Sequence, residues 1–350
     1  MPRVAFRYLS ISLVAWLSIF AVGVSPQPQR LPFVAITQHP ACLPGVGEIA
    51  FQARAADSVG PSNVELYASC LDGSSRRRLT HQAGDNAGAV WSPDGRRIAF
   101  HSFRGGTSEG GTIPGVALYV MNADGSDVRR VIDRFAMNAA WSPDGSWLAF
   151  VSLPSDLTPQ DLMDVNQWAA KRDIFVVRTD GTGLRNLTNA TGSDNYPSWS
   201  PDGQQIAFSS GRDHGEDYSE IYVMSSDGTG TRRLTFNKDG VPGCCEDAAP
   251  AWSPDSRWLA FISKRDGNSE VYKMRRDGTQ QQRLTRHPTF DGYPSWSADG
   301  EYVIFEKHRR APLTADEPPR TPDSLYVVRA DGSDPRSLGI AGTRPAWRWR

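Results

Sequence analysis

The sequence is poor in cysteine and histidine, and its charges nearly cancel. Its 350 residues include 4 cysteines and 6 histidines, and 38 basic residues face 39 acidic ones. A balance this close to neutral leaves no basic field of the kind that attracts nucleic acid, so we expect no nucleic-acid partner. The histidines show no zinc-ligand spacing, so the sequence predicts no metal centre of that kind. They are His39, His81, His101, His214, His287 and His308.

Long apolar runs are also missing, except for one at the N-terminus. That run covers residues 8–24, follows Arg3 and Arg7, and precedes a stretch rich in Pro and Gln. This order is typical of a secretory signal. We therefore predict a signal peptide at 1–24, a linker at 25–39, and a periplasmic or secreted protein that does not insert into the membrane after cleavage. The alternative is an uncleaved N-terminal membrane anchor, for which a run of 17 residues is short.

What the sequence has in abundance is a repeated phrase. Tryptophans recur every 44 to 58 residues from Trp91 to Trp347. Self-similarity at this period is typical of a repeat architecture, and no sustained helical period accompanies it. Five tryptophans open near-identical phrases, WSPDGRRIAF, WSPDGSWLAF, WSPDGQQIAF, WSPDSRWLAF and WSADGEYVIF. We expect the repeat tryptophans to be core residues rather than a ligand cage.

One unit, residues 89–134, predicts four strands. Its Ser-Pro-Asp-Gly segment at 92–95 fits a type I turn, and the apolar residues on both sides predict two antiparallel strands. A third strand is predicted at 117–121, followed by the hairpin dipeptide Asp124-Gly125. A short fourth strand is predicted at 128–132. Corresponding third strands are predicted at 174–177, 221–224, 271–274 and 325–328.

A first unit without a tryptophan precedes these. The segment PACLPGVGEIAF at 40–51 aligns with PAWSPDSRWLAF and places Cys42 at the tryptophan position. There are then seven first strands but only six of each other strand. We predict that Pro345–Trp349 completes the first unit and closes a six-bladed β-propeller of four-stranded antiparallel blades at 40–350. A seven-bladed ring is the alternative.

The four cysteines allow three pairings after export. Cys42 with Cys70, both in the first unit, is one candidate. The adjacent Cys244 and Cys245 close on each other or pair elsewhere, and the sequence does not decide between these.

These repeats resemble a known family. The phrase P-x-W-S-P-D-G-x-x-I-A-F, followed by I-Y-V-M-x-x-D-G-x-x-x-x-L-T, is similar to the WD-like β-propeller repeats of TolB-type proteins. Such repeats also occur in the propellers of prolyl oligopeptidases and tricorn-like proteases. The resemblance covers residues 40–347 and implies a propeller fold. The α/β domain that precedes the propeller in TolB proteins and the hydrolase domain of prolyl oligopeptidases have no counterpart, so we expect a stand-alone, monomeric propeller.

The loops of such a propeller divide between two faces. The uniform Ser-Pro-Asp-Gly and Asp-Gly turns share one face, whereas the second–third and fourth–first connections share the other and vary widely. Variable loops on a rigid scaffold usually carry binding, so we expect a protein or peptide partner on the variable-loop face. Four polar residues there lie five positions before a tryptophan, and we predict that they ring the channel mouth and bind the partner. They are Asn86, Asp194, Asp247 and Asp291.

Structural roles compete with this hypothesis. Each carboxylate alternatively caps its own turn. Arg212-Asp213 and Arg265-Asp266, with Arg104 in a similar place, are expected to bridge neighbouring blades rather than to catalyse.

Catalytic and metal-binding patterns are weak. Gly106–Gly110 matches G-x-S-x-G but lies in a Gly-rich loop rather than between a strand and a helix, so we do not assign it a nucleophile. The loop 152–172 holds several acidic residues without EF-hand spacing, so a solvated loop is favoured over a calcium site. The sequence therefore predicts no catalytic residue, no metal and no cofactor.

Our first hypothesis is an exported, non-enzymatic binding scaffold, TolB-like in its propeller. The alternative is a propeller hydrolase or lyase acting on peptide or glycan at the channel mouth, with His101, His214 and His308 as the residues of interest. A third possibility is an accessory or sensor module of a transport or protease system.

Overall fold

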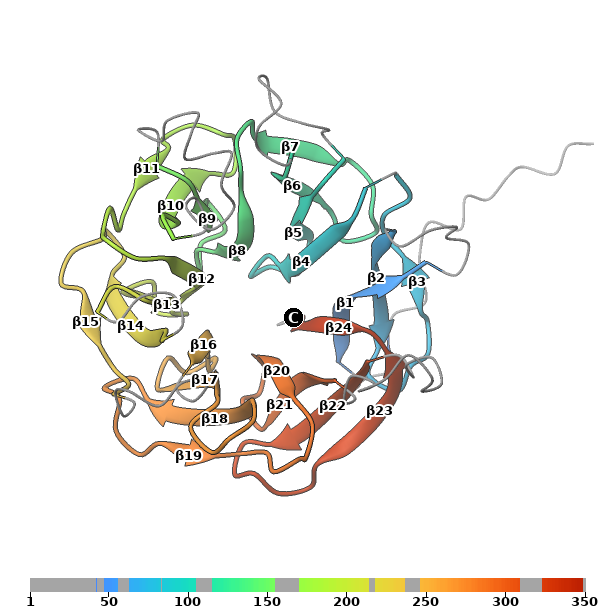
Figure 1. The fold of residues 1–350 in the computed structure, drawn as a ribbon. Helices are drawn as coiled ribbons and strands as arrows, with labels where there is room; N and C mark the ends of the chain where they lie inside the picture. Colours follow the sequence, from blue (N-terminus) through green and yellow to red (C-terminus); the bar gives the residue numbers. More distant parts are fainter. Residues whose placement is uncertain are drawn as a thin grey trace, which may run out of the picture. The chain divides into compact units, whose positions relative to one another are not determined.

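The computed structural model describes residues 42, 47–55, 63–82, 84–104, 115–154, 170–213, 218–236, 246–308 and 323–348. In this part of the chain every regular element is a β-strand. The strands form six four-stranded antiparallel sheets arranged as blades of a ring (Figure 1). The predicted all-β, six-bladed propeller is thus confirmed, and the seven-bladed alternative is wrong.

The compact unit that contains the blades runs from His39 to Arg350. The predicted signal peptide at 1–24 and linker at 25–39 lie outside the described residues. No helix in the described ranges is long and apolar enough to cross a membrane.

Each blade is ordered from the centre of the ring outward (Figure 1). The innermost strands, in blades 1 to 6, are β24 (Thr343–Trp347), β4 (Asn86–Trp91), β8 (Met137–Trp141), β12 (Asp194–Trp199), β16 (Asp247–Trp252) and β20 (Asp291–Trp296). The second strands are β1 (Glu48–Arg54), β5 (Arg97–Ser102), β9 (Trp147–Ser152), β13 (Gln205–Ser210), β17 (Trp258–Ser263) and β21 (Tyr302–Lys307).

The outer half of each blade is less regular. Outside the first blade, the third strands extend the predicted ranges by one residue at one or both ends. The third strands are β2 (Val64–Cys70), β6 (Ala117–Asn122), β10 (Asp173–Arg178), β14 (Glu220–Ser225), β18 (Glu270–Arg275) and β22 (Ser324–Arg329). The outermost strands are short, four of them with only two residues, because few backbone bonds hold the blade edge. They are β3 (Arg77–Arg78), β7 (Arg129–Ile132), β11 (Arg185–Asn186), β15 (Arg232–Arg233), β19 (Gln282–Arg283) and β23 (Arg336–Ala341).

The ring closes through the last strand. β24 is hydrogen-bonded to β1, so the first blade combines the two ends of the propeller sequence. Ile49 pairs with Trp347, and Ala50 pairs with Ala346. The predicted closure is confirmed, although the strand begins two residues earlier and ends two residues earlier than predicted. The candidate disulfide of Cys42 with Cys70 also forms in this blade, whereas Cys244 and Cys245 lie outside the described residues.

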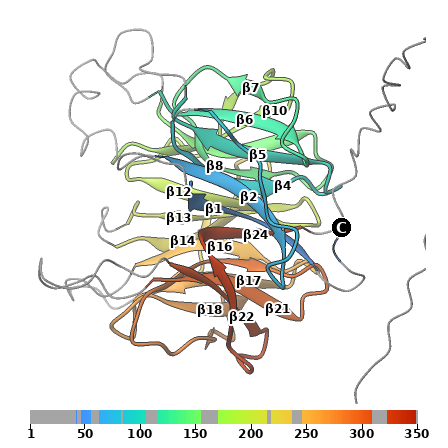
Figure 2. The ribbon, with the colours of Figure 1, turned by 90° about the vertical axis from the view of Figure 1, so that its right-hand side faces the viewer.

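The strands of each blade run between the two faces of the ring, as the side view shows (Figure 2). On one face lie the uniform turns, whose chemistry is local. In the turn before β5, the hydroxyl of Ser92 donates to Asp94 and accepts the backbone N–H of Arg97. Gly95 closes this turn with a φ of 66°. A left-handed residue is needed there, which explains why four of five such turns use glycine.

The core lies between neighbouring blades. Each second strand contributes one phenylalanine that is completely buried: Phe51, Phe100, Phe150, Phe208, Phe261 and Phe305. The repeat tryptophans join them; five are buried and Trp199 is half-buried. The ring N–H groups of Trp141, Trp252 and Trp296 each donate to a backbone carbonyl in the preceding blade's innermost strand at 3.1 Å. The tryptophans are therefore core residues that tie blade to blade, as predicted.

A bulge recurs in every innermost strand. The residue three positions before each repeat tryptophan has a positive φ between 47° and 62°. The ladder to the second strand shifts register at the same point, as between Asn195 and Ser198. A bulge re-aims the side chain at its centre. These residues line the central channel together with the residues that follow them. The residues with the positive φ are Gly88, Asn138, Tyr196, Ala249, Tyr293 and Arg344.

Candidate functional site

The four residues predicted to ring the channel mouth each lie at the start of an innermost strand, on the variable-loop face. All four are completely buried. They are Asn86, Asp194, Asp247 and Asp291, the first residues of β4, β12, β16 and β20. They lie between blades and bond within the protein, which differs from the solvent-facing rim that the sequence suggested. Their role in partner binding stays a prediction.

Three of these residues are held by arginines that follow the second strand of the same blade. Arg104 donates to Asn86 at 2.8 Å, Arg212 to Asp194 at 3.0 Å, and Arg265 to Asp247 at 2.8 Å. Each guanidinium also lies over two aromatic rings of its blade, about 5 Å from their centres. The recurrent arginines therefore bridge mainly within a blade rather than between neighbouring blades as expected, and Arg104 also donates to Gln82 in the loop that leaves the first blade. Their role is structural.

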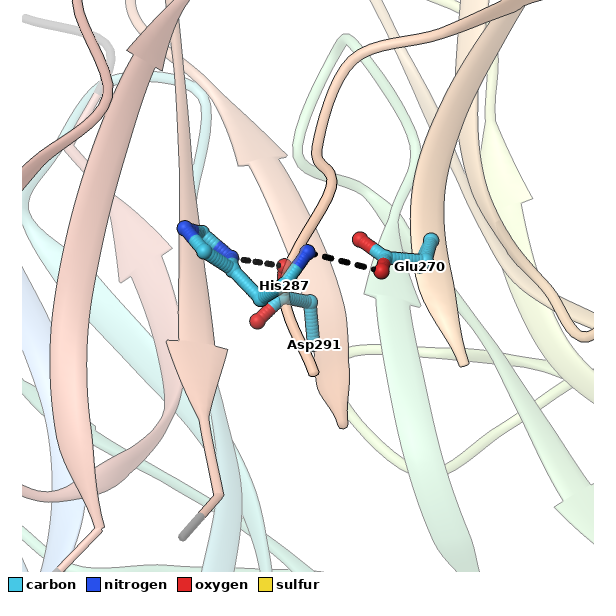
Figure 3. A group of neighbouring side chains, drawn as sticks. All are labelled: Glu270, His287 and Asp291. Atoms are coloured by element: carbon cyan, nitrogen blue, oxygen red, sulfur yellow. Dashed lines mark hydrogen bonds and ion pairs between the residues drawn. The ribbon is translucent and has the colours of Figure 1, made fainter. Parts of the chain in front are cut away.

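The sixth blade replaces this arginine with a histidine. His287, which lies in the loop before β20, bonds the carboxylate of Asp291 through Nδ1 at 2.6 Å. Its ring contacts Phe305 and Tyr326, which correspond to the aromatic pair under the arginines. The backbone N–H of His287 donates to Glu270 in the fifth blade at 2.9 Å, so the residue joins two blades (Figure 3).

Buried carboxylates meet in pairs at three consecutive junctions between blades. Each pair has one member at the start of a third strand and the other at the start of the next innermost strand. The pairs are Asp173 with Asp194, Glu220 with Asp247, and Glu270 with Asp291. Burial raises the pKa of Asp194, Asp247 and Asp291, and the neighbouring arginine or histidine opposes this rise. At the junction of blades 1 and 2, Asn86 takes the place of the aspartate and donates to Glu65 at 3.1 Å.

At the junction of blades 5 and 6, three side chains carry the ligand atoms of a metal site, but other groups already bond to these atoms. One atom each of Glu270, His287 and Asp291 lies within 4.8 Å of the others. However, Arg283 donates to Glu270 at 2.8 Å, and the Thr285 hydroxyl binds its other oxygen. A cation here would compete with a guanidinium and several neutral donors. We therefore interpret this cluster as a hydrogen-bonded junction.

A cleft of about 390 Å³ opens beside this junction on the variable-loop face. Its lining carries more acidic than basic groups: Glu246, Asp291, Glu306 and Asp323 against Lys264 and His308. Lys264 pairs with Glu246, and His308 lies between Glu306 and Asp323. Hydrogen bonds to the two carboxylates raise the pKa of His308 to about 10, so the imidazole is protonated at neutral pH.

Aromatic side chains are exposed on the same face. Phe290 lines the cleft and is 49% exposed, and Phe103 and Phe236 in other variable loops are 40% and 73% exposed. Large exposed apolar side chains in clefts are typical of binding surfaces. The sequence analysis missed Phe290, because only its exposure distinguishes it from a core phenylalanine.

The histidines of the described ranges that the sequence singled out, His101 and His308, lie in different parts of the ring. His101 is 4% exposed and accepts the backbone N–H of Asn138 at 3.5 Å, while His308 lies in the cleft of the sixth blade. Burial lowers the pKa of His101 to about 3, so this ring is neutral. His214, Gly106–Gly110 and the acidic residues of the 152–172 loop lie outside the described residues.

The central channel adjoins the cleft at Tyr293, which lines both. A cavity of about 170 Å³ lies in the channel, and a funnel of about 380 Å³ continues toward the face of the uniform turns. Arg344 reaches into this channel, where it donates to Asn138 at 3.1 Å and to the Tyr293 hydroxyl at 3.0 Å. The sequence analysis did not single out Arg344, which lies one residue before the predicted closing strand and inside the observed one.

Comparison with known proteins identifies the family to which this propeller belongs. Residues 240–344 match the TolB beta propeller domain. The protein Atu1656 of Agrobacterium fabrum (strain C58), itself uncharacterized, is 35% identical over 272 residues, which cover 74% of this chain and 79% of that protein. The chain belongs to the TolB-type β-propeller family. The family assignment that the repeats suggested is thereby confirmed.

Two further similarities define what this TolB-type propeller shares with larger proteins. The uncharacterized peptidase YuxL of Bacillus subtilis (strain 168) is 28% identical over 224 residues, 54% of this chain but only 31% of YuxL. TolB from Acinetobacter baumannii superposes with a TM-score of 0.67 at 20% identity, over 86% of this chain and 66% of TolB. The TolB-type propeller thus spans about a third of YuxL and two thirds of that TolB, and the likeness to TolB at this identity concerns the fold.

Proposed function

We propose that this protein is an exported, non-enzymatic binding scaffold that presents its variable-loop face and channel mouth to a protein or peptide partner. In this proposal it acts as a monomer in the periplasm or outside the cell, after its N-terminal signal is removed. The partner surface centres on the cleft between blades 5 and 6.

The observation that carries the proposal is the position of Phe290 at an acidic cleft. A half-exposed aromatic ring supplies apolar contact area at little entropic cost. The cleft beside it contains four carboxylates and two basic groups. A partner segment with an apolar side chain next to Lys or Arg is complementary to this lining.

The buried polar residues have an indirect role in the proposal. Asp291 forms part of the cleft wall, whereas Asn86, Asp194 and Asp247 hold the loops that follow the second strands through their arginines. We infer that the last three act by positioning the variable-loop face for the partner rather than by touching it.

The non-enzymatic part of the proposal is supported by how the described histidines are engaged. A general base needs a free ring nitrogen beside a reacting group. Both ring nitrogens of His308 bond carboxylates, and the ring of His287, whose Nδ1 bonds Asp291, packs against Phe305 and Tyr326.

Site-specific photo-crosslinking tests the proposal. A photoreactive phenylalanine at position 290 of the full chain, expressed in the source cells, is expected to give a discrete covalent adduct with the partner. The same group at Leu184, an exposed apolar residue next to an outermost strand, is the matched control and should give none. Equal adducts at both positions, or none at 290, would contradict the proposal.

A charge reversal then tests the electrostatic part. Glu246→Lys should lower the adduct yield at position 290, because it reverses a carboxylate at the cleft. Glu301→Lys makes the same change at an exposed residue in a uniform turn on the other face and should leave the yield unchanged.

A further inference from the structure

The channel interior has a charge pattern of its own. Of the fifteen residues that line its cavity, Arg344 alone carries a formal charge at neutral pH. The remaining lining is formed by prolines, small residues, Asn138 and two tyrosines. No carboxylate of the described residues lies within ion-pair distance of the Arg344 side chain. A cation in such a lining attracts an anion.

Arg344 keeps donor groups to spare. A guanidinium has five N–H groups and accepts nothing. Within the described residues, one N–H of Arg344 goes to Asn138 and one to Tyr293. The guanidinium also lies 4.4 Å from the centre of the Tyr293 ring, which holds it in one orientation. The fork is therefore fixed in place before any ligand arrives.

The two tyrosines add one more donor. Their hydroxyl oxygens lie 3.1 Å apart, so one hydroxyl proton is used between them. Two hydroxyls carry two protons, so the other proton is left over, whichever ring donates to the other. Burial raises the pKa of the Tyr293 hydroxyl, which keeps it protonated. The pair of Tyr196 and Tyr293 thus offers one O–H donor close to Arg344.

One carboxylate, that of Glu306, contacts the backbone of Arg344 and is already engaged. Glu306 accepts the backbone N–H of Arg344 at 2.6 Å, and its other oxygen bonds the ring of His308. His308 is protonated at neutral pH, and its positive charge offsets part of the negative charge of Glu306. Glu306 therefore acts on the Arg344 side chain through its charge, which raises the pKa of the guanidinium, and not through a direct bond.

We propose that the central channel is a carboxylate-binding site, in which the Arg344 guanidinium and the free hydroxyl proton of the Tyr196–Tyr293 pair bind the two oxygens. Guanidinium groups favour carboxylates because the two planar forks match. The cavity of about 170 Å³ holds a small carboxylate in place of several waters. The carboxylate belongs either to a small free acid or to the C-terminus of a peptide that enters through the adjoining funnel.

This inference goes beyond the proposed function, and of its three residues Tyr293 alone also lines the external cleft. Arg344 and Tyr196 lie inside the channel, whereas Phe290 and Glu246 line the external cleft. Either proposal stands if the other fails.

Isothermal titration of the purified full chain tests the site with defined probes. We expect sodium acetate or the peptide acetyl-Ala-Ala-Ala with a free carboxylate to bind, and the same peptide with a C-terminal amide not to bind. Arg344→Gln should weaken binding about tenfold or more, since a charge-assisted hydrogen bond is lost. Arg329→Gln, at an exposed arginine outside the channel, should have no effect.

The double variant Tyr196→Phe/Tyr293→Phe keeps the test decisive if Arg344→Gln does not fold. It removes both hydroxyls and with them the spare proton while both rings stay, so affinity should fall several-fold while the fold is kept. Binding of acetate without the peptide assigns the site to small free acids, and binding of the peptide, with or without acetate, shows that it admits a C-terminus; each of these outcomes supports the proposal. Failure of both carboxylates to bind, equal binding of the amide, or wild-type affinity in folded Arg344→Gln would overturn it.

Discussion

Ile49 and Trp347 lie opposite each other in the ladder of β1 and β24, although they lie at opposite ends of the propeller sequence. Their pairing gives the first blade its innermost strand and leaves β1 without an open edge. The backbone of Arg348 adds a further bond to the carbonyl of Glu48 at 2.9 Å. The stability of the ring therefore depends on its last residues.

Truncation after Gly342 removes β24 and should destabilise the protein and make it self-associate. The exposed edge of β1 would present unpaired backbone groups, which promote pairing with another chain. Urea unfolding and size-exclusion chromatography measure the two effects. Deletion of residues 349–350 alone is the control, and a truncated chain with the wild-type midpoint and elution volume would contradict closure as the source of stability.

Arg265→Gln should lower the free energy of unfolding by up to about 3–5 kcal/mol, because it leaves the buried carboxylate of Asp247 without its partner. Adding Asp247→Asn should restore much of the loss, since asparagine occupies the corresponding position 86. Urea unfolding of the two single variants and the double variant gives the coupling energy. Additive losses would show that the pair does not act as a unit.

His308 should stabilise the protein in a pH-dependent way. Its pKa in the folded protein is raised to about 10 by bonds to Asp323 and Glu306, above the ordinary value of about 6.5. The stabilisation is therefore fully present below pH 6.5 and is lost as the pH rises toward 10. The difference in unfolding free energy between wild type and His308→Gln should shrink between pH 6 and pH 9.5. His81→Gln, at an exposed histidine, is the control; a difference for His308→Gln that stays constant would contradict this.

His101 should act in the opposite direction. Burial lowers its pKa to about 3, so between pH 3 and 6.5 the unfolded chain binds a proton that the folded protein does not. The contribution of His101 to stability is then lost as the pH falls below 6.5, by at most about 1.4 kcal/mol per pH unit. Relative to His101→Gln, the wild type should lose stability from pH 7 to pH 4.5 in urea unfolding. A parallel pH profile for the two proteins would show that His101 takes up its proton in the folded state.

The disulfide of Cys42 with Cys70 should stabilise the first blade. It closes a loop with a sequence separation of 28 residues, for which chain entropy predicts about 3–4 kcal/mol at most. Replacement of both cysteines by serine should lower the unfolding midpoint by a corresponding amount. Addition of a reducing agent to the wild type should reproduce the loss, and it should leave the midpoint of the double variant unchanged.

The fold could be predicted from the sequence because its determinants are local. A Ser-Pro-Asp-Gly turn forms from the side chain of Ser92 and the φ of Gly95, and neither needs distant contacts. Repetition of that turn sets the number of strands, and one surplus strand at the C-terminus implies closure. Even the pairing of β24 with β1 follows from counting.

The site could not be predicted in the same way. Asp194 and Asp247 occupy positions that a regular strand would make available to the channel mouth, but packing buries them between blades beside Arg212 and Arg265. His287 takes the place of an arginine from a different loop, which no repeat alignment reveals.

The sequence by itself determined the six blades, their order and the two kinds of loop, because turn chemistry and hydrophobic periodicity act over a few residues. Only the tertiary structure decided which polar groups remain accessible. The bulge before each tryptophan places Tyr196, Tyr293 and Arg344 in one channel, although long stretches of chain separate them. Their proximity exists only once the ring has closed and the blades have packed.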